Sequence, residues 1–190
     1  GTGATAGGGT IAGPFATTSG TITGLSAATM YDVYVRQECT AGVVYSTNSA
    51  TTTFFSGCAG SSCAYTFHLT DNFGDGWNGA SIDVKVNGFV VSTLSLTSGC
   101  ESTVSVNICE GASLALVCTN AGSFPDEVGL RMTDPFGAIL FETRGTTTYT
   151  SATSGNACVD LTSYPTPGTL QDITTGTKYT GTGNCTPPPC

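Results

Sequence analysis

Hydrophobic and polar residues alternate along short stretches of the chain, with a period of two instead of the longer period of a helix. Within residues 29–36, this alternation places Tyr31, Val33 and Val35 on one face of an extended segment. Similar stretches occupy residues 65–70, 81–86, 113–117, 127–133 and 138–141. Clusters of Gly, Asn, Asp and Ser separate them, which is typical of strands joined by tight turns. The pattern predicts an all-β fold.

Two short motifs predict hairpins within that fold. Asn87-Gly88 lies between two alternating stretches, and this dipeptide favours a two-residue turn. The segment from Asp134 to Gly137 has the Asp-Pro-x-Gly composition of a turn between two further strands.

The first part of the chain carries the run ITGLSAATMYDVYVRQEC at residues 22–39 and SATTTF at residues 49–54. These runs resemble the C-terminal half of a fibronectin type III domain, a family in which Leu25 and Tyr31 would bridge two sheets near a corner. A seven-stranded sandwich needs about 100 residues, and roughly half of that is present. The resemblance implies a half-sandwich, which would expose apolar inner faces and strand edges unless something completes it.

The second part carries DNFGDGWNG at residues 71–79, the Asn-Gly turn, and PDEVGLRMTDPFGAILF at residues 125–141, in that order. This arrangement resembles a secreted β-sandwich module marked by a D-x-x-G-D-G-W-N-G loop. Such modules are common in large extracellular, adhesin-like bacterial proteins. The resemblance implies a jelly-roll-like sandwich.

We therefore expect two β-sandwich units, one Ig/fibronectin III-like and one jelly-roll-like, with an extended C-terminal tail. The expected boundaries are residues 1–57 for the partial fibronectin-like unit, 58–163 for the second module, and 164–190 for a Thr- and Pro-rich tail. Residues 168–182 contain enough Thr, Ile and Tyr to add one strand to another sheet. The tail is expected to be a linker or a donor strand.

The amino-acid composition limits where the protein is expected to be located and what it is expected to bind. Only 9% of the 190 residues are charged, against about 25% in a typical soluble domain, and the formal net charge is −8 at pH 7. A negative chain is a poor match for nucleic acid or an anionic membrane. No apolar run approaches the roughly 20 residues that span a bilayer. The nine cysteines favour an oxidising environment, so we expect an extracellular or cell-surface location.

The cysteines are expected to form disulfides, because the chain has a single histidine and no C-x-x-C pair that would indicate zinc. Nine is an odd number, so one cysteine is free, bonded to another chain or paired outside this sequence. Connectivity does not follow from sequence alone. Position along the chain favours these pairings: Cys39 with Cys58, Cys63 with Cys158, one bridge among Cys100, Cys109 and Cys118, and a local or inter-chain bond of Cys185 and Cys190.

One constellation carries metal-binding chemistry. Asp71, Asp75 and Asn78 supply closely spaced oxygen donors in a Gly-rich loop, which suits Ca²⁺. The loop glycines would provide positive φ angles, and Trp77 would pack beneath the loop as an apolar anchor. In the family that the module resembles, a Glu precedes the later strand; Glu127 occupies that position and would close the metal site from across the fold. The alternative is a loop of Asx-turns without metal.

Enzymatic activity is not expected. His68 is the only histidine and falls on the strand face opposite Phe67 and Leu69, where an exposed side chain is predicted. No G-x-S-x-G nucleophile motif is present. Asp71, Asp75 and Glu127 could in principle act as paired carboxylates, but a metal loop uses the same residues more naturally.

Two functions remain from these observations. The first is a structural subunit of an extracellular fibre or surface polymer, because the chain begins within a recognisable domain and its tail could complete the half-sandwich of the next copy. The partners would then be copies of itself. The second is a non-catalytic adhesion or ligand-binding module of a large secreted bacterial protein, with glycans as possible ligands. Asn184-Cys185-Thr186 also fits the acceptor pattern for N-linked glycans.

Overall fold

The computed structural model describes residues 12–13, 15–16, 19–41, 44–146, 158, 169–170 and 172–188. These residues form strands, turns and loops but no helix, which confirms the predicted all-β class. Within them, no segment is a helix long and apolar enough to cross a membrane. The chain divides into two compact units, Gly1–Ala59 and Gly60–Cys190, which we describe separately.

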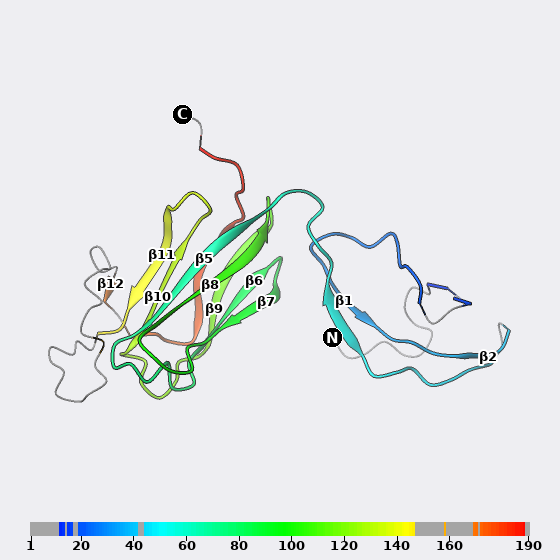
Figure 1. Ribbon diagram of the computed structural model, residues 1–190, viewed down its shortest axis with the longest axis horizontal. Coiled ribbons are helices and arrows are strands. Elements are labelled where there is room, and N and C mark those ends of the chain that lie inside the picture. Colours follow the sequence, from blue (N-terminus) through cyan, green and yellow to red (C-terminus); the bar gives the residue numbers. More distant parts are fainter. Residues whose placement is uncertain are drawn as a thin grey trace. The chain divides into compact units, whose positions relative to one another are not determined.

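The first unit consists of two antiparallel strand pairs (Figure 1). One joins β1 (Met30–Val33) to β4 (Thr52–Phe55), and the other joins β2 (Glu38–Thr40) to β3 (Val44–Tyr45). Its only ring stack in the described part joins Tyr31 of β1 to Phe54 of β4, with centroids 5.8 Å apart. The Tyr31 hydroxyl accepts a hydrogen bond from the backbone N–H of Ser26 at 2.7 Å.

No described side chain of this first unit is buried. Seven of its large apolar side chains are instead exposed, and Val35 is the extreme at 69%. The exposed set comprises Phe15, Ile22, Leu25, Val35, Val44, Tyr45 and Phe54. The described part of residues 1–59 therefore has no hydrophobic core of its own.

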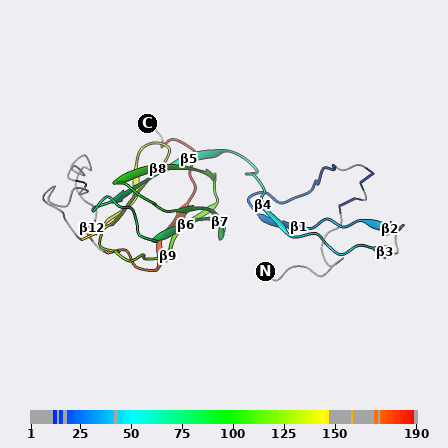
Figure 2. The same cartoon turned by 60° about the horizontal axis from the view of Figure 1, so that its bottom comes forward.

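The second unit contains two sheets that lie as layers (Figure 2). The five-stranded sheet has the order β12-β11-β10-β5-β8 and the four-stranded sheet the order β13-β9-β6-β7. The first comprises β5 (Ser62–Asp71), β8 (Glu101–Cys109), β10 (Val128–Thr133), β11 (Ile139–Arg144) and β12 (Thr169–Leu170). The second comprises β6 (Ser81–Val86), β7 (Phe89–Leu94), β9 (Ser113–Asn120) and β13 (Gly176–Thr182).

The core of the second unit lies between these layers and follows the predicted alternation. Buried and partly exposed residues alternate along β6, over Tyr65–Leu69 of β5 and over Leu114–Cys118 of β9. The five-stranded sheet contributes Tyr65, Phe67, Leu69, Ile108, Val128, Leu130 and Met132, and the four-stranded sheet Ile82, Val84, Val86, Leu114 and Leu116. Burial of this apolar surface is the main stabilising contribution to the module.

Both predicted hairpins are present. Asn87 and Gly88 have φ angles of 51° and 83°, as a two-residue turn between Val86 and Phe89 requires. Asp134 closes the other turn, because its Oδ1 accepts hydrogen bonds from the N–H groups of Phe136 at 2.9 Å and Ala138 at 2.8 Å.

The C-terminal segment is not the separate tail that the sequence suggested. β13 pairs antiparallel with β9 of the same unit, and Ile173 is buried in the core. Beyond β13, Asn184 N–H donates to the Tyr65 hydroxyl at 2.7 Å, and Cys185 is disulfide-bonded to Cys63. The β-prone composition of this segment therefore completes the sheet of its own module.

The disulfides also differ from the expected pairings. The structure bonds Cys63 to Cys185 and Cys100 to Cys158. Cys58 and Cys109 are disulfide-bonded as well, whereas Cys39 is an exposed free thiol and Cys118 a buried one. Cys190 lies outside the described residues. The expected pairs Cys63–Cys158 and Cys185–Cys190 were wrong because β13 returns to its own module and places Cys185 beside the start of β5. The expected pair Cys39–Cys58 was wrong as well, because Cys39 is a free thiol.

The predicted bridge among Cys100, Cys109 and Cys118 is also wrong. Cys100 has its partner in Cys158, and the thiol of Cys118 lies in the sandwich core on the buried face of β9. A buried free cysteine behaves as a small apolar side chain.

Candidate metal centre

Strand pairing brings together the acidic residues that the sequence placed far apart. Asp71 is the last residue of β5 and lies opposite Val128, the first residue of β10. Glu127 directly precedes Val128, and its carbonyl accepts a hydrogen bond from Asn72 N–H at 3.1 Å. The register of β5 against β10 thus fixes Glu127 beside Asp71.

Three carboxylates converge at this end of the sheet. Oxygen atoms of Asp71, Asp75 and Glu127 all lie within 4.8 Å of one another. Asp71 is 0% exposed and Glu127 is 5% exposed, whereas Asp75 is exposed in the loop. The structure therefore groups the three acidic residues that the sequence singled out.

Positive φ angles shape the loop that carries Asp75 and Asn78. Gly74, Gly76 and Gly79 have φ angles of 100°, 95° and 93°, and Asn78 has φ 47°. Gly76 also lies against the chain after β7, since a Cβ atom there would be 2.6 Å from the Leu96 carbonyl oxygen. The predicted role of the glycines is confirmed at all three positions.

Trp77 anchors the loop from below, as expected. Its side chain is 1% exposed, and its indole N–H donates a 2.8 Å hydrogen bond to the carbonyl of Thr70. Its backbone N–H donates to the Leu96 carbonyl at 2.7 Å. The loop is thus tied both to the end of β5 and to the segment that follows β7.

Burial and the neighbouring carboxylate both disfavour the charged form of Asp71 in this cluster. Burial raises the pKa of Asp71; the Gly74 N–H, which donates to Asp71 Oδ1, lowers it, and the nearby charge of Asp75 raises it further. Within the described residues, Asp71 Oδ2 and Asn78 Oδ1 are buried without a hydrogen-bond partner. Buried polar oxygens are normally satisfied, so each of these two atoms needs an explanation.

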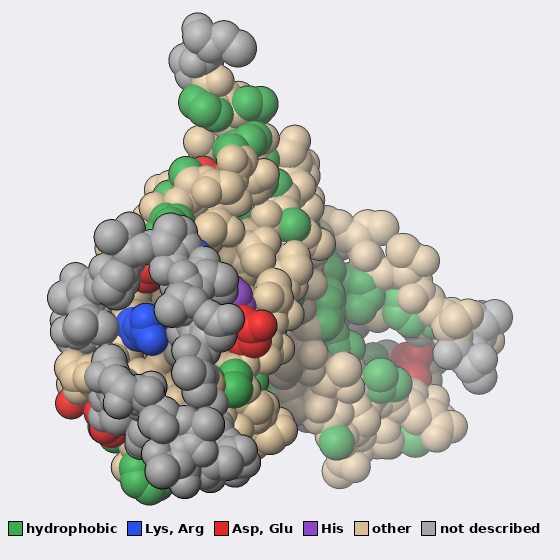
Figure 3. Space-filling view, turned by 60° about the vertical axis from the view of Figure 1, so that its left-hand side comes forward, with side chains coloured by type: hydrophobic (Ala, Val, Ile, Leu, Met, Phe, Trp, Pro, Cys, Tyr) green, Lys and Arg blue, Asp and Glu red, His purple; other side chains and the backbone are tan. Residues whose placement is uncertain are grey.

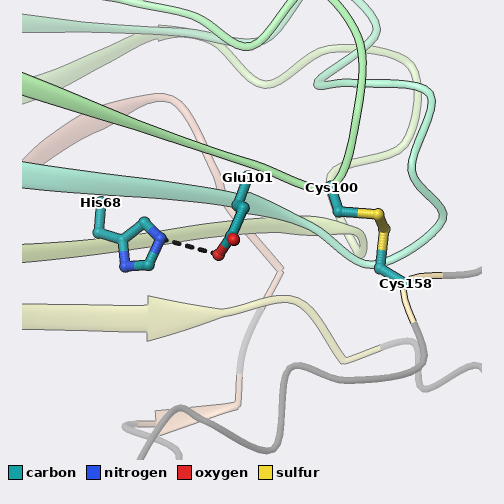
Figure 4. A network of polar contacts seen from close by, with 4 residues as sticks. All are labelled: His68, Cys100, Glu101 and Cys158. Carbon is teal, nitrogen blue, oxygen red and sulfur yellow. Dashed lines mark hydrogen bonds and ion pairs between the residues drawn. A yellow bond between two sulfur atoms is a disulfide. The ribbon is translucent and has the colours of Figure 1, made fainter.

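A disulfide and an ion pair lie next to each other at the start of β8, where Cys100 precedes Glu101 (Figure 4). The backbone N–H of Asp71 donates to the Cys100 carbonyl at 2.8 Å, and Cys100 is bonded to Cys158. Next to Cys100, Glu101 contacts His68 at 3.1 Å on the outer face of the sheet. His68 lies on the outward strand face that the alternation predicted, but its side chain is only partly exposed, at 30%.

Charged side chains are otherwise sparse. Among the described residues in the view of Figure 3, uncharged polar side chains and backbone cover most of the surface. Three carboxylates within one small region are therefore an unusually high local density of charge for a chain with only 13 acidic residues.

Sequence reasoning overlooked Asn72. This residue is 3% exposed, and its side-chain amide donates to the Gly145 carbonyl at 3.5 Å. Its position directly after a strand and beside Asp71 was the available signal.

The donor set is suited to a hard cation. Carboxylate and amide oxygens are the ligands that Ca²⁺ and Mg²⁺ prefer, whereas Zn²⁺ prefers histidine and cysteine.

Comparisons with protein-family models, curated proteins and solved structures give no match. The site is therefore interpreted from its own residues and geometry.

Proposed function

We propose that this chain is a non-catalytic structural subunit of an extracellular polymer, in which strands of a neighbouring copy complete the first unit. One observation carries the proposal. None of the described side chains in residues 12–59 is buried, and seven large apolar ones are exposed. The second unit, in contrast, has a full core between two sheets.

Physical stability supports completion by a partner. A two-stranded sheet is marginal in water by itself and becomes stable when further strands or a second layer cover its apolar face. The unpaired edges of β1 and β4 can accept another strand through backbone hydrogen bonds. A neighbouring copy would supply both the strand and the missing apolar layer.

The details of the first unit also support its resemblance to the fibronectin type III family. A tyrosine whose hydroxyl bonds to the backbone a few residues upstream is a corner feature of such sandwiches. Tyr31 and Ser26 make this contact. A domain of that kind has two complete sheets, so the resemblance also implies added strands.

The donor strand in this proposal differs from the one suggested by sequence. β13 lies in its own module, held by β9 and by the Cys63–Cys185 disulfide. Another segment of the neighbouring copy therefore completes the first unit. A head-to-tail contact of this type generates a filament when it does not close into a ring. The six disulfide-bonded cysteines among the described residues suit an extracellular location.

A second candidate function is adhesion or ligand binding by the second unit as a module of a larger secreted protein. Its complete core favours this candidate, since such a module needs no partner to fold. Phe124 and Phe136 are also exposed on its loops, where aromatic rings can stack on a sugar or contact a protein.

Electron microscopy of the native material, with and without reductant, tests the polymer. We expect regular filaments whose repeating mass matches this chain. Val35→Lys should abolish them, because it places a charge on the open apolar surface of the first unit. Phe136→Lys, at an exposed apolar position of the second unit, is the matched control and should leave filaments intact.

Two outcomes would contradict assembly through the first unit. Monodisperse monomers with rapid hydrogen exchange throughout residues 19–59 would rule out self-completion and favour the ligand-binding module. Filaments that persist in Val35→Lys would show that the first unit does not form the contact.

A further inference from the structure

Two buried oxygens, one in the acidic cluster and one in the loop that carries Asp75, have no hydrogen-bond partner among the described residues. Asp71 is fully buried, and its Oδ2 lacks a hydrogen-bond partner within the described residues. Asn78 Oδ1, from the same loop, is also buried without one. A buried oxygen left in this state costs free energy, and an ionised one costs more.

Negative charge accumulates at the same point. The carboxylates of Asp71, Asp75 and Glu127 approach within 4.8 Å. Within the described residues, neither Asp71 nor Asp75 forms an ion pair with a cationic side chain. Three carboxylates at this spacing repel one another unless a cation lies between them.

The ligand chemistry selects the cation. The donors are three carboxylates and one amide oxygen, with no imidazole or thiolate. Ca²⁺ accepts six to eight such oxygens in flexible geometry, and water or backbone carbonyls commonly fill the remaining positions. Mg²⁺ demands a regular octahedron and retains its own water, so an irregular loop favours the larger ion.

We propose that Asp71, Asp75, Asn78 and Glu127 bind one Ca²⁺ ion that joins the end of β5, the 72–80 loop and the start of β10. The ion satisfies the two partnerless oxygens and neutralises the repulsion among the carboxylates. It acts as a structural clamp, because its ligands come from the end of β5, the residue before β10 and the loop anchored by Trp77. This site does not depend on the polymer proposed above.

Titration of the chelator-treated full chain with CaCl₂ tests the site. Calorimetry should detect one site per chain, with a dissociation constant at or below the roughly millimolar range of extracellular modules. The melting temperature should rise with the logarithm of free Ca²⁺, since a ligand that binds only the folded state stabilises it. MgCl₂ at equal concentration should give a smaller rise.

A terbium titration gives an independent readout. Trp77 is the only tryptophan and directly precedes Asn78, so excitation of its indole should sensitise emission from Tb³⁺ bound in the cluster. Added Ca²⁺ should displace Tb³⁺ and quench that emission.

Asp75→Asn separates ion binding from folding. Asp75 is exposed, and its charge repels Asp71, so the variant should be as stable as the parent without Ca²⁺ or more stable. Its Ca²⁺ affinity should fall by about tenfold or more, because ligand charge sets the affinity of such sites. Asp134→Asn is the matched control, because Asp134 lies in the β10–β11 turn and an Asn oxygen can accept the same hydrogen bonds.

Three outcomes would overturn the proposal. The first is the absence of both binding heat and a melting shift at about 10 mM Ca²⁺, well above the expected range. The second is an equal response to Mg²⁺ and Ca²⁺. The third is an unchanged Ca²⁺ response in Asp75→Asn.

Discussion

The carboxylates of Asp71 and Glu127 lie within 4.8 Å of each other because Asp71 ends β5 directly opposite Val128, the residue after Glu127. The antiparallel register, and not the loop sequence alone, therefore determines the composition of the cluster. A slip of one residue would turn each side chain of β10 to the other face of the sheet. The buried side chains Leu130 and Met132 prevent that slip, since they would leave the core.

The close approach of Gly76 to the Leu96 carbonyl predicts a difference between two otherwise similar glycines. Gly76 and Gly79 have nearly equal φ angles, but the space beside Gly79 is open. Gly79→Ala should cost about 1–2 kcal/mol of unfolding free energy from backbone strain. Gly76→Ala should cost about 1–3 kcal/mol more, because its methyl group meets backbone atoms. Urea denaturation measures both, and equal losses would contradict the role of the close approach.

The indole N–H of Trp77 predicts a loss of stability in Trp77→Phe. Phenylalanine keeps most of the apolar contact but leaves the buried Thr70 carbonyl without its donor. The unfolding free energy should fall by about 1–3 kcal/mol. Far-ultraviolet circular dichroism during urea denaturation is the appropriate measurement, because the variant has no tryptophan. The exposed substitution Phe136→Leu should change stability by less than about 0.5 kcal/mol.

The Cys63–Cys185 disulfide predicts how firmly β13 is held. It joins residues 122 apart in the sequence, so its loss frees a long loop in the unfolded chain. The double variant Cys63→Ser with Cys185→Ser should lose about 2–5 kcal/mol of stability. Amide hydrogens of β13 should exchange faster in the variant. Cys39→Ser removes an exposed free thiol and should leave exchange in β13 unchanged.

The two free thiols should differ in reactivity. Burial raises the pKa of Cys118, an effect that the positive charge of Lys178 partly opposes. A raised thiol pKa leaves less thiolate at pH 8, and the thiolate is the form that reacts with alkylating agents. Iodoacetamide should therefore label Cys39 in the folded chain and Cys118 only after unfolding. Mass spectrometry of the peptides distinguishes the sites, and equal labelling in the folded state would contradict burial of Cys118.

Local sequence rules predicted much of this fold. Alternation identified the strands that bury Phe67, Leu69 and Ile82, and the Asn87-Gly88 dipeptide identified a hairpin. The loop glycines and Trp77 have the expected roles because those roles depend mainly on neighbouring residues. Such features need only the chemistry of a short segment.

Non-local features could not be predicted in the same way. Whether a β-prone segment pairs within its own module or with another chain depends on which sheet edge is available. Residues 176–182 pair with β9 of their own module. Disulfide connectivity follows from that choice, so the expected partners of Cys63 and Cys185 were wrong. The burial of Asn72 likewise depends on Gly145, which is far along the chain.

The Cys63–Cys185 disulfide has a mechanical consequence. The bond joins the second residue of β5 to a position just beyond β13, so it spans nearly the whole second module. Tension applied at Cys63 and Cys185 themselves passes through one covalent bond between sulfur atoms. The disulfide shields the strands between these two cysteines from that load while the bond is intact. Under traction, this module would act as an inextensible link, and any lengthening would have to come from the residues before Cys63 or after Cys185.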